Sequence, residues 1–179
     1  VNAPEVLEQA PSGKAKELAK LANDEVAGIL AQYPDCFPTA MATVYPGDMN
    51  AALTEIQRCV SEYGFRGVQL TTTFQGKPLS DPMFFPLYEL MAELDLPIEI
   101  HPCNGPMSKP DMIFNWPLET TWMMIGLATS GVFEKYPDIK FVTHHCGAMI
   151  PVWHNRVFNS WFANRMYVNE AAGIGLDKS

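Results

Sequence analysis

The chain has 179 residues, of which 47% are hydrophobic and 18% are charged, and its formal net charge is −8. This length and composition are typical of one soluble globular domain, which we expect to span residues 1–179. The acidic balance argues against nucleic-acid or anionic-membrane binding, since both need clustered Lys and Arg. No apolar run reaches the length of a membrane span and no signal-peptide pattern opens the chain, so we expect a cytoplasmic protein.

The first half of the chain alternates between helical and strand patterns. Residues 1–13 show no period and contain two prolines, which predicts an irregular end. Apolar residues at helical spacing predict a helix over residues 14–33, and residues 38–44 read as a short buried strand. Asp48 is a plausible N-cap for a second helix that Gly64 ends, and residues 66–73 form the next predicted strand.

The second half continues the alternation. Ser80 or Asp81 caps a third predicted helix with Pro82 in its first turn, and the next strand covers residues 97–101. A long polar loop over residues 103–116 precedes a helix over residues 117–130 that is apolar nearly all round. The remaining predictions are a strand over residues 139–144, a helix over residues 150–165, and an irregular end over residues 166–179.

Four predicted strands begin near residues 38, 66, 97 and 139, and a helix follows each one. Strands and helices that alternate at this spacing are typical of parallel βα units in an α/β fold. Two architectures fit, an open doubly wound sheet or part of a (β/α)8 TIM barrel. No phosphate-binding glycine motif follows any strand, and candidate catalytic residues at strand ends favour the barrel.

Histidines end two of the predicted strands. His101 ends one strand, and His144 and His145 end another. Since the carboxyl ends of parallel strands meet at one rim, these strands predict a single site there. Neutral imidazole is a good ligand for zinc and similar divalent ions. If the second strand persists, His144 and His145 point to opposite faces, so only one of them faces the site. His154 lies in a predicted helix and is expected on the surface or in packing.

Other polar residues have weaker patterns. Glu99 shares a strand face with His101, and we expect a buried carboxylate paired with a cation, with a supporting hydrogen bond deeper in the sheet as the alternative. Arg156 is either a solvated helix charge or a guanidinium near an anionic substrate. No nucleophile-elbow motif follows a strand. The cysteines have no CxxC spacing and are expected to be reduced, buried thiols: Cys36, Cys59, Cys103 and Cys146.

Several segments together resemble the amidohydrolase-related family, whose members are metal-dependent (β/α)8 barrels that include decarboxylases. The resemblance runs from about Ala15 to about Arg156, and the order of its pieces is more specific than any single piece. The matching segments are GFRGVQLTTTFQG, LPIEIHP, PLETTWMMIGLATSGVFEKYPDIKFVTHHCGAMIP and the NRV that follows.

This resemblance implies roles for three residues. The family holds its metal with an HxH pair on the first strand, a His ending the fifth and an Asp ending the eighth, and the fifth-strand position matches His101. The acid/base histidine that ends the sixth strand matches His145. The arginine after that strand matches Arg156, and in some relatives it reaches the substrate carboxylate of a neighbouring subunit. The strand GVQLTTT has no carboxylated lysine, which implies one divalent metal ion, zinc or alternatively manganese.

The chain also departs from the family pattern. It contains no HxH pair, and Asp177 is the one late candidate for the eighth-strand Asp. By resemblance the chain covers strands three to six of eight. We therefore expect either a subset of a longer enzyme or an inactive fragment, since a catalytic zinc site normally uses three protein ligands.

The resulting functional prediction is a metal-dependent carboxy-lyase that decarboxylates a small aromatic or unsaturated carboxylic acid. A metal-dependent hydrolase of the same family is the alternative. A homodimer is expected because Trp122, Met123, Met124 and Ile125 spread over more than one face of the helix predicted at residues 117–130. Burial of that excess area under residues absent from this sequence is the other explanation.

Overall fold

The computed structural model describes residues 3–103 and 113–171, and for residues 3–5 and 161–171 it describes the backbone alone. Seven α-helices, two 3-10 helices and six strands lie in these residues. In chain order they are α1 (Ala3–Gln9), α2 (Ser12–Gln32), β1 (Ala42–Thr43), α3 (Met49–Tyr63), β2 (Val68–Thr71), β3 (Thr73–Phe74), β4 (Lys77–Pro78), η1 (Pro82–Phe84), α4 (Phe85–Glu93), β5 (Pro97–His101), α5 (Asn115–Thr129), α6 (Val132–Lys135), β6 (Lys140–Thr143), η2 (His145–Gly147) and α7 (Ile150–Ala171).

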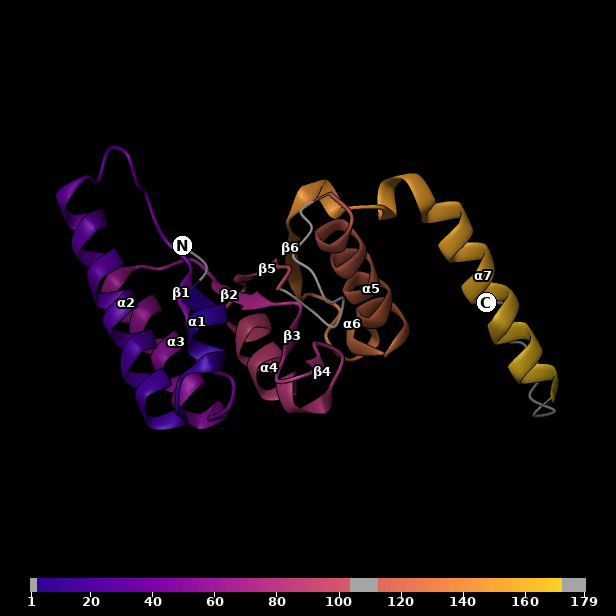
Figure 1. Cartoon of the computed structure of the whole chain (residues 1–179), viewed down its shortest axis with the longest axis horizontal. Helices are drawn as coiled ribbons and strands as arrows, with labels where there is room; N and C mark the ends of the chain where they lie inside the picture. The colour runs from indigo at the N-terminus through magenta and orange to yellow at the C-terminus, as the bar shows by residue number, and fades with distance from the viewer. Residues whose placement is uncertain (1–2, 104–112, 172–179) are drawn as a thin grey trace.

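A parallel sheet runs through the middle of the molecule in the strand order β1-β2-β5-β6 (Figure 1). Its register pairs Val68 with Ile98, and Ile98 with Phe141. Helices α3, α4 and α5 follow β1, β2 and β5 along the chain and connect them to the next parallel strand, which is the parallel βα arrangement. The predicted α/β class with parallel βα units is therefore confirmed.

Local sequence explains where several elements begin and end. The Asp48 side chain accepts a hydrogen bond from the Ala51 backbone N–H at 3.1 Å, which caps α3 as predicted. Gly64 ends the same helix in the left-handed region at φ 69°. Asp81 caps η1 by accepting from the Met83 N–H at 2.9 Å, with Pro82 in the first turn. Strand β5 has the predicted bounds.

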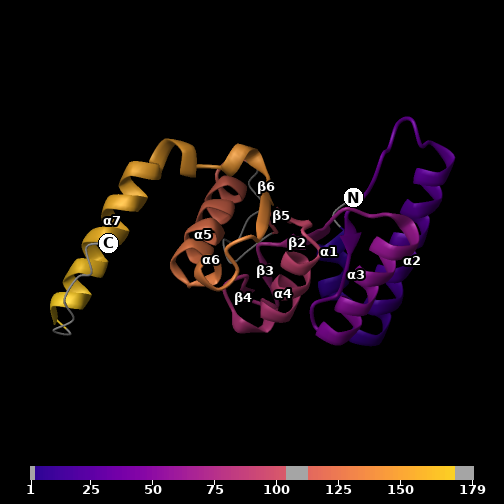
Figure 2. The ribbon, with the colours of Figure 1, turned by 180° about the vertical axis from the view of Figure 1, so that it is seen from behind.

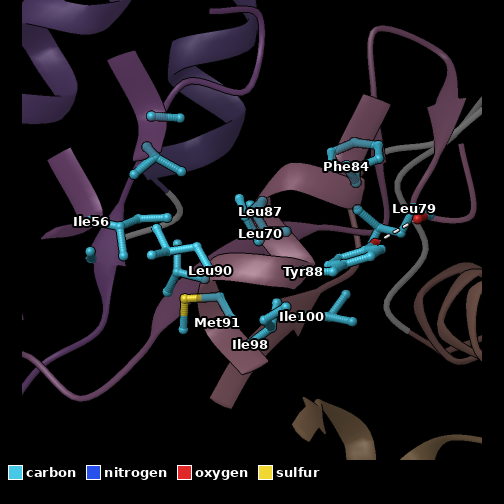
Figure 3. Packing of buried hydrophobic residues seen from close by; sticks show 14 of the residues in the cluster. Ile56, Leu70, Leu79, Phe84, Leu87, Tyr88, Leu90, Met91, Ile98 and Ile100 are labelled. Atoms are coloured by element: carbon cyan, nitrogen blue, oxygen red, sulfur yellow. Dashed lines mark hydrogen bonds between the residues drawn. The ribbon is translucent and has the colours of Figure 1, made fainter. Parts of the chain in front are cut away.

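The hydrophobic core lies between the sheet and the helices that cover one of its faces. Val68, Leu70, Ile98 and Ile100 point to that face from β2 and β5, and all four are buried. Figure 3 shows side chains of α3 and α4 packed against them, with the Tyr88 hydroxyl donating to the Leu79 carbonyl at 2.5 Å. Alternate strand residues point to the opposite face, where Gln69, Glu99 and His101 lie.

Several element predictions differ from the structure. Within the predicted irregular end, residues 3–13 are mostly helical, because α1 and the start of α2 lie there. Strands β1, β2 and β6 are shorter than predicted, and the antiparallel hairpin of β3 and β4 was not predicted at all. The last helix continues to Ala171, so residues 166–171 are helical, whereas residues 172–179 lie outside the described residues.

Helix α7 projects away from the rest of the chain in both views (Figures 1 and 2). Its residues 151–156 are exposed, as the burial along the helix shows. In the part of the chain that the structure describes, no helix combines the length and apolarity needed to cross a membrane.

Candidate active site

Strand β5 delivers His101 to the carboxyl end of the sheet. Its burial alternates, because Ile98 and Ile100 enter the core while Glu99 and His101 face the other side and stay half-buried. His101 is the last residue of β5. Its Nδ1 lies 2.6 Å from the Pro102 carbonyl oxygen, and this contact orients the imidazole ring. His101 therefore occupies the rim position that the sequence predicted.

Both histidines after β6 lie beside His101. The ring centroids of His101 and His144 are 4.5 Å apart, and the centroid of His145 lies 6.1 Å from that of His101 and 6.0 Å from that of His144. The prediction that only one of the pair faces the site is wrong. Strand β6 ends at Thr143, and positive φ values of 58° at His145 and 53° at Cys146 turn the chain, so strand alternation no longer applies.

A hydrogen-bonded row lies on the same sheet face. The Glu99 Oε1 and His144 Nε2 are 2.9 Å apart, and the Gln69 side-chain amide donates to the other Glu99 oxygen at 3.2 Å. Glu99 was expected to be buried against a cation, but it is half-buried and its partners are an imidazole and an amide. The row connects β2, β5 and the end of β6, and it sets the position of His144 next to His101.

Trp116, in the first turn of α5, packs against two of the histidines. Its ring lies 5.5 Å from the His101 ring in an edge-to-face arrangement and 5.7 Å from the His145 ring in a stacked arrangement. Edge-to-face and offset-stacked geometries are the favourable ones for such pairs. Helix α5 begins at Asn115, before the predicted start at residue 117, so Trp116 lies in its first turn and not in the predicted loop over residues 103–116.

Helix α5 is also tied to both loops that carry the histidines. Glu119 Oε1 accepts hydrogen bonds from the Cys103 N–H at 3.1 Å and from the Thr72 hydroxyl. Thr121 Oγ1 accepts from the Met149 N–H at 3.1 Å. One helix therefore holds the segment after β5 and the segment after η2, which keeps the spacing between His101 and His145.

Burial and neighbouring groups shift the pKa values of His145 and Cys103. Partial desolvation lowers the pKa of His145, and the nearby His101 and His144 imidazoles lower it further. Burial raises the pKa of the Cys103 thiol, against hydrogen bonds from Thr72 and Thr73 that lower it. His145 therefore favours its neutral form more strongly than an isolated histidine does.

Other predicted residues lie apart from this cluster. Arg156 is exposed on α7 and, within the described residues, forms no hydrogen bond or ion pair with another side chain. His154 is also exposed, as predicted, with its Nδ1 3.1 Å from the Pro151 oxygen. All four cysteines are free, but Cys36 and Cys146 are exposed rather than buried.

The described residues do not by themselves complete a metal centre. Across residues 3–103 and 113–171 no group of three or more His, Cys, Asp or Glu side chains is arranged to hold an ion. His101 is suited to one ligand position, because its imidazole is half-buried at the strand end and the Pro102 carbonyl orients it. Asp177, the weak candidate for a further ligand, lies outside the described residues.

The sequence missed Trp116, Glu119 and the inward position of His144. Continuing the β5–β6 register places His144 opposite His101, and this pairing is known only from the structure. Trp116 and Glu119 follow a long loop, so nothing in the sequence pattern links them to the strand ends.

The chain matches a known family and several characterised proteins. The Amidohydrolase family profile matches residues 3–169. The γ-resorcylate decarboxylase of Polaromonas sp. is 32% identical over 180 residues, covering 90% of this chain and 55% of the relative. The 2-keto-4-carboxy-3-hexenedioate hydratase of Sphingobium sp. is 30% identical over 143 residues, covering 74% and 41%.

A solved structure also superimposes on this fold. The 5-carboxyvanillate decarboxylase of Novosphingobium aromaticivorans, with manganese and 4-hydroxy-3-methoxy-5-nitrobenzoic acid, is 34% identical with a TM-score of 0.81. The superposition covers 86% of this chain and 46% of that one. The chain thus spans about half the length of the curated decarboxylases it matches most fully.

Proposed function

Because this chain belongs to the amidohydrolase family, we propose that it contributes the His101–His145 rim to a metal-dependent decarboxylase of a small aromatic carboxylic acid. The observation that carries this proposal is the convergence of His101, His144 and His145 at the carboxyl ends of β5 and β6. Active sites of βα barrels lie at that end of the sheet. The relatives named as decarboxylases of aromatic acids supply the reaction class.

Three residues have distinct roles in this proposal. His101 would be one ligand of a divalent ion, which would polarise substrate oxygens and stabilise the charge that develops as carbon dioxide leaves. His145 would deliver a proton to the ring carbon as its bond to the carboxyl carbon breaks and the electron pair stays on the ring. Arg156 would hold a carboxylate, and its exposed position on α7 fits contact with another subunit better than contact within this chain.

Water addition is the second candidate function. The hydratase relative is nearly as similar to this chain as the decarboxylases, and it adds water to an unsaturated acid by name. The hydrolase alternative uses the same histidines, with His145 as the base that takes a proton from water. Product analysis separates these outcomes, because only decarboxylation releases carbon dioxide.

Several finer expectations belong to the proposal as well. Zinc suits an imidazole ligand, whereas manganese is the ion bound in the solved relative. A homodimer would cover Trp122, which is 65% exposed on α5, and an apolar groove of about 740 Å³ that opens nearby between α5, β6 and the start of α7. A cytoplasmic location and a single domain over residues 1–179 stay predictions from composition.

The decisive experiment combines metal content with product analysis. Purified chain is loaded with manganese or zinc and incubated with γ-resorcylate, and carbon dioxide release and metal content are measured for wild type, His101→Ala, His145→Asn and His154→Ala. We expect His101→Ala to lose metal, and His145→Asn to keep metal while turnover falls by about 10²–10⁴-fold. The exposed His154→Ala control should match wild type.

Three outcomes would contradict the proposal. Wild type without carbon dioxide release in either metal state would remove the decarboxylase assignment for this chain. Water addition without carbon dioxide release would favour the second candidate. Loss of metal in His145→Asn but not in His101→Ala would reverse the two roles.

A further inference from the structure

Trp116 carries a hydrogen-bond donor that nothing in the described structure uses. Its indole Nε1 is buried and has no hydrogen-bond partner among the described residues. Buried indole N–H groups normally find an acceptor, because an unpaired buried donor costs about 1–3 kcal/mol. The unpaired indole N–H therefore either lowers the stability of the fold at all times or forms its hydrogen bond with a bound ligand.

The position of Trp116 distinguishes it from the other unpaired polar group. Thr120 Oγ1 also lacks a partner among the described residues, but its side chain is fully buried and offers no opening to a ligand. Trp116 is half-buried, and its ring contacts both His101 and His145 at the rim. A ligand that reaches these histidines therefore passes within reach of the indole.

The helix that carries the indole is held in place by hydrogen bonds to two loops. Thr121 and Glu119, from the next turn of α5, bind the backbone of Met149 and Cys103. These bonds attach the helix to the loops on both sides of the histidines. A donor fixed in this way loses little conformational entropy when it binds a ligand.

We propose that Trp116 is a substrate-contacting residue whose indole N–H donates a hydrogen bond to a carboxylate oxygen of the bound aromatic acid. The proposal deepens the decarboxylase function and rests on it. An indole N–H is a donor only, so it selects an acceptor atom, and a carboxylate is the strongest acceptor that such a substrate carries. The indole ring at the same time forms an aromatic wall beside His145.

The test follows the indole N–H directly. Zinc-loaded chain labelled with ¹⁵N-tryptophan is titrated with γ-resorcylate and, separately, with resorcinol, which lacks the carboxylate. The chain has four tryptophans, so the Trp116 signal is assigned by its loss in Trp116→Phe, or by elimination from the other three Trp→Phe variants. We expect a saturable downfield shift of the Trp116 indole proton with γ-resorcylate and no such shift with resorcinol.

Binding affinities provide the second measurement. Trp116→Phe keeps an aromatic ring and removes the donor, so its Kd for γ-resorcylate should rise about tenfold. Tyr33→Phe keeps an aromatic ring and removes a polar hydrogen at an exposed site after α2, away from the histidines, and it should leave Kd unchanged. Saturable binding with an unmoved indole signal, an equal shift with resorcinol, or an unchanged Kd in Trp116→Phe would each overturn this proposal and leave the decarboxylase function standing. Absence of saturable binding by wild type would overturn both.

Discussion

Replacing Glu119 with Ala should destabilise the fold by about 2–4 kcal/mol. The carboxylate accepts hydrogen bonds from the Cys103 N–H at 3.1 Å and from the Thr72 hydroxyl, and both donors belong to buried residues. Each buried donor left without its acceptor costs about 1–3 kcal/mol. The Cys103 N–H keeps a longer contact to Thr72 Oγ1 at 3.4 Å, so we expect a loss in the lower half of the added range of about 2–6 kcal/mol.

The assay is urea unfolding followed by far-UV circular dichroism. Glu119→Gln keeps the Oε1 acceptor and loses its charge, so it should cost about 1 kcal/mol, since charge-assisted bonds are roughly twice as strong as neutral ones. Glu89→Ala, at an exposed site on α4, is the control and should stay within about 0.5 kcal/mol of wild type. A Glu119→Ala variant as stable as this control, with an unchanged m-value, would refute the anchoring role of Glu119.

Two further predictions concern stability. Gly67→Ala should lower the free energy of unfolding by about 1–3 kcal/mol, because its Cβ would meet Met41 Sδ and lie 2.7 Å from the Pro97 carbonyl oxygen. Gly28→Ala has open space in the middle of α2 and should instead stabilise by about 0.5–1 kcal/mol, so equal effects in thermal melts would contradict the steric argument. Burial raises the pKa of Glu55, but hydrogen bonds from Arg58 and Asn23 outweigh burial, and the pKa falls below the usual 4.5. The stability that ionised Glu55 contributes is thus complete above pH 4.5 and is lost as pH falls through the lowered pKa, so the stability difference between wild type and Glu55→Gln should shrink in acid urea titrations. A difference that stays constant down to pH 3 would show that Glu55 contributes nothing through its charge.

The order of the elements could be predicted because it depends on local patterns. Asp48, Gly64 and Pro82 act within one helical turn of their own position, and the structure places all three at helix ends as expected. Strand β5 was predicted with correct bounds because its apolar residues alternate against Glu99 and His101. The hairpin of β3 and β4 was missed because its strands have two residues each, too few to show a period.

The residues of the site also fall into two groups, those that the sequence predicts and those that only the structure brings together. The sequence by itself determined that His101 stands at the carboxyl end of a parallel strand, because strand periodicity and chain order are local properties. Only the tertiary structure decided that His145 joins His101 and His144, because the chain turns at His145 and Cys146 through left-handed conformations that no periodic pattern marks. The tertiary structure likewise decided that Trp116 and Glu119 meet the strand ends, since a helix that starts after a long loop is positioned by packing and buried hydrogen bonds rather than by its own sequence.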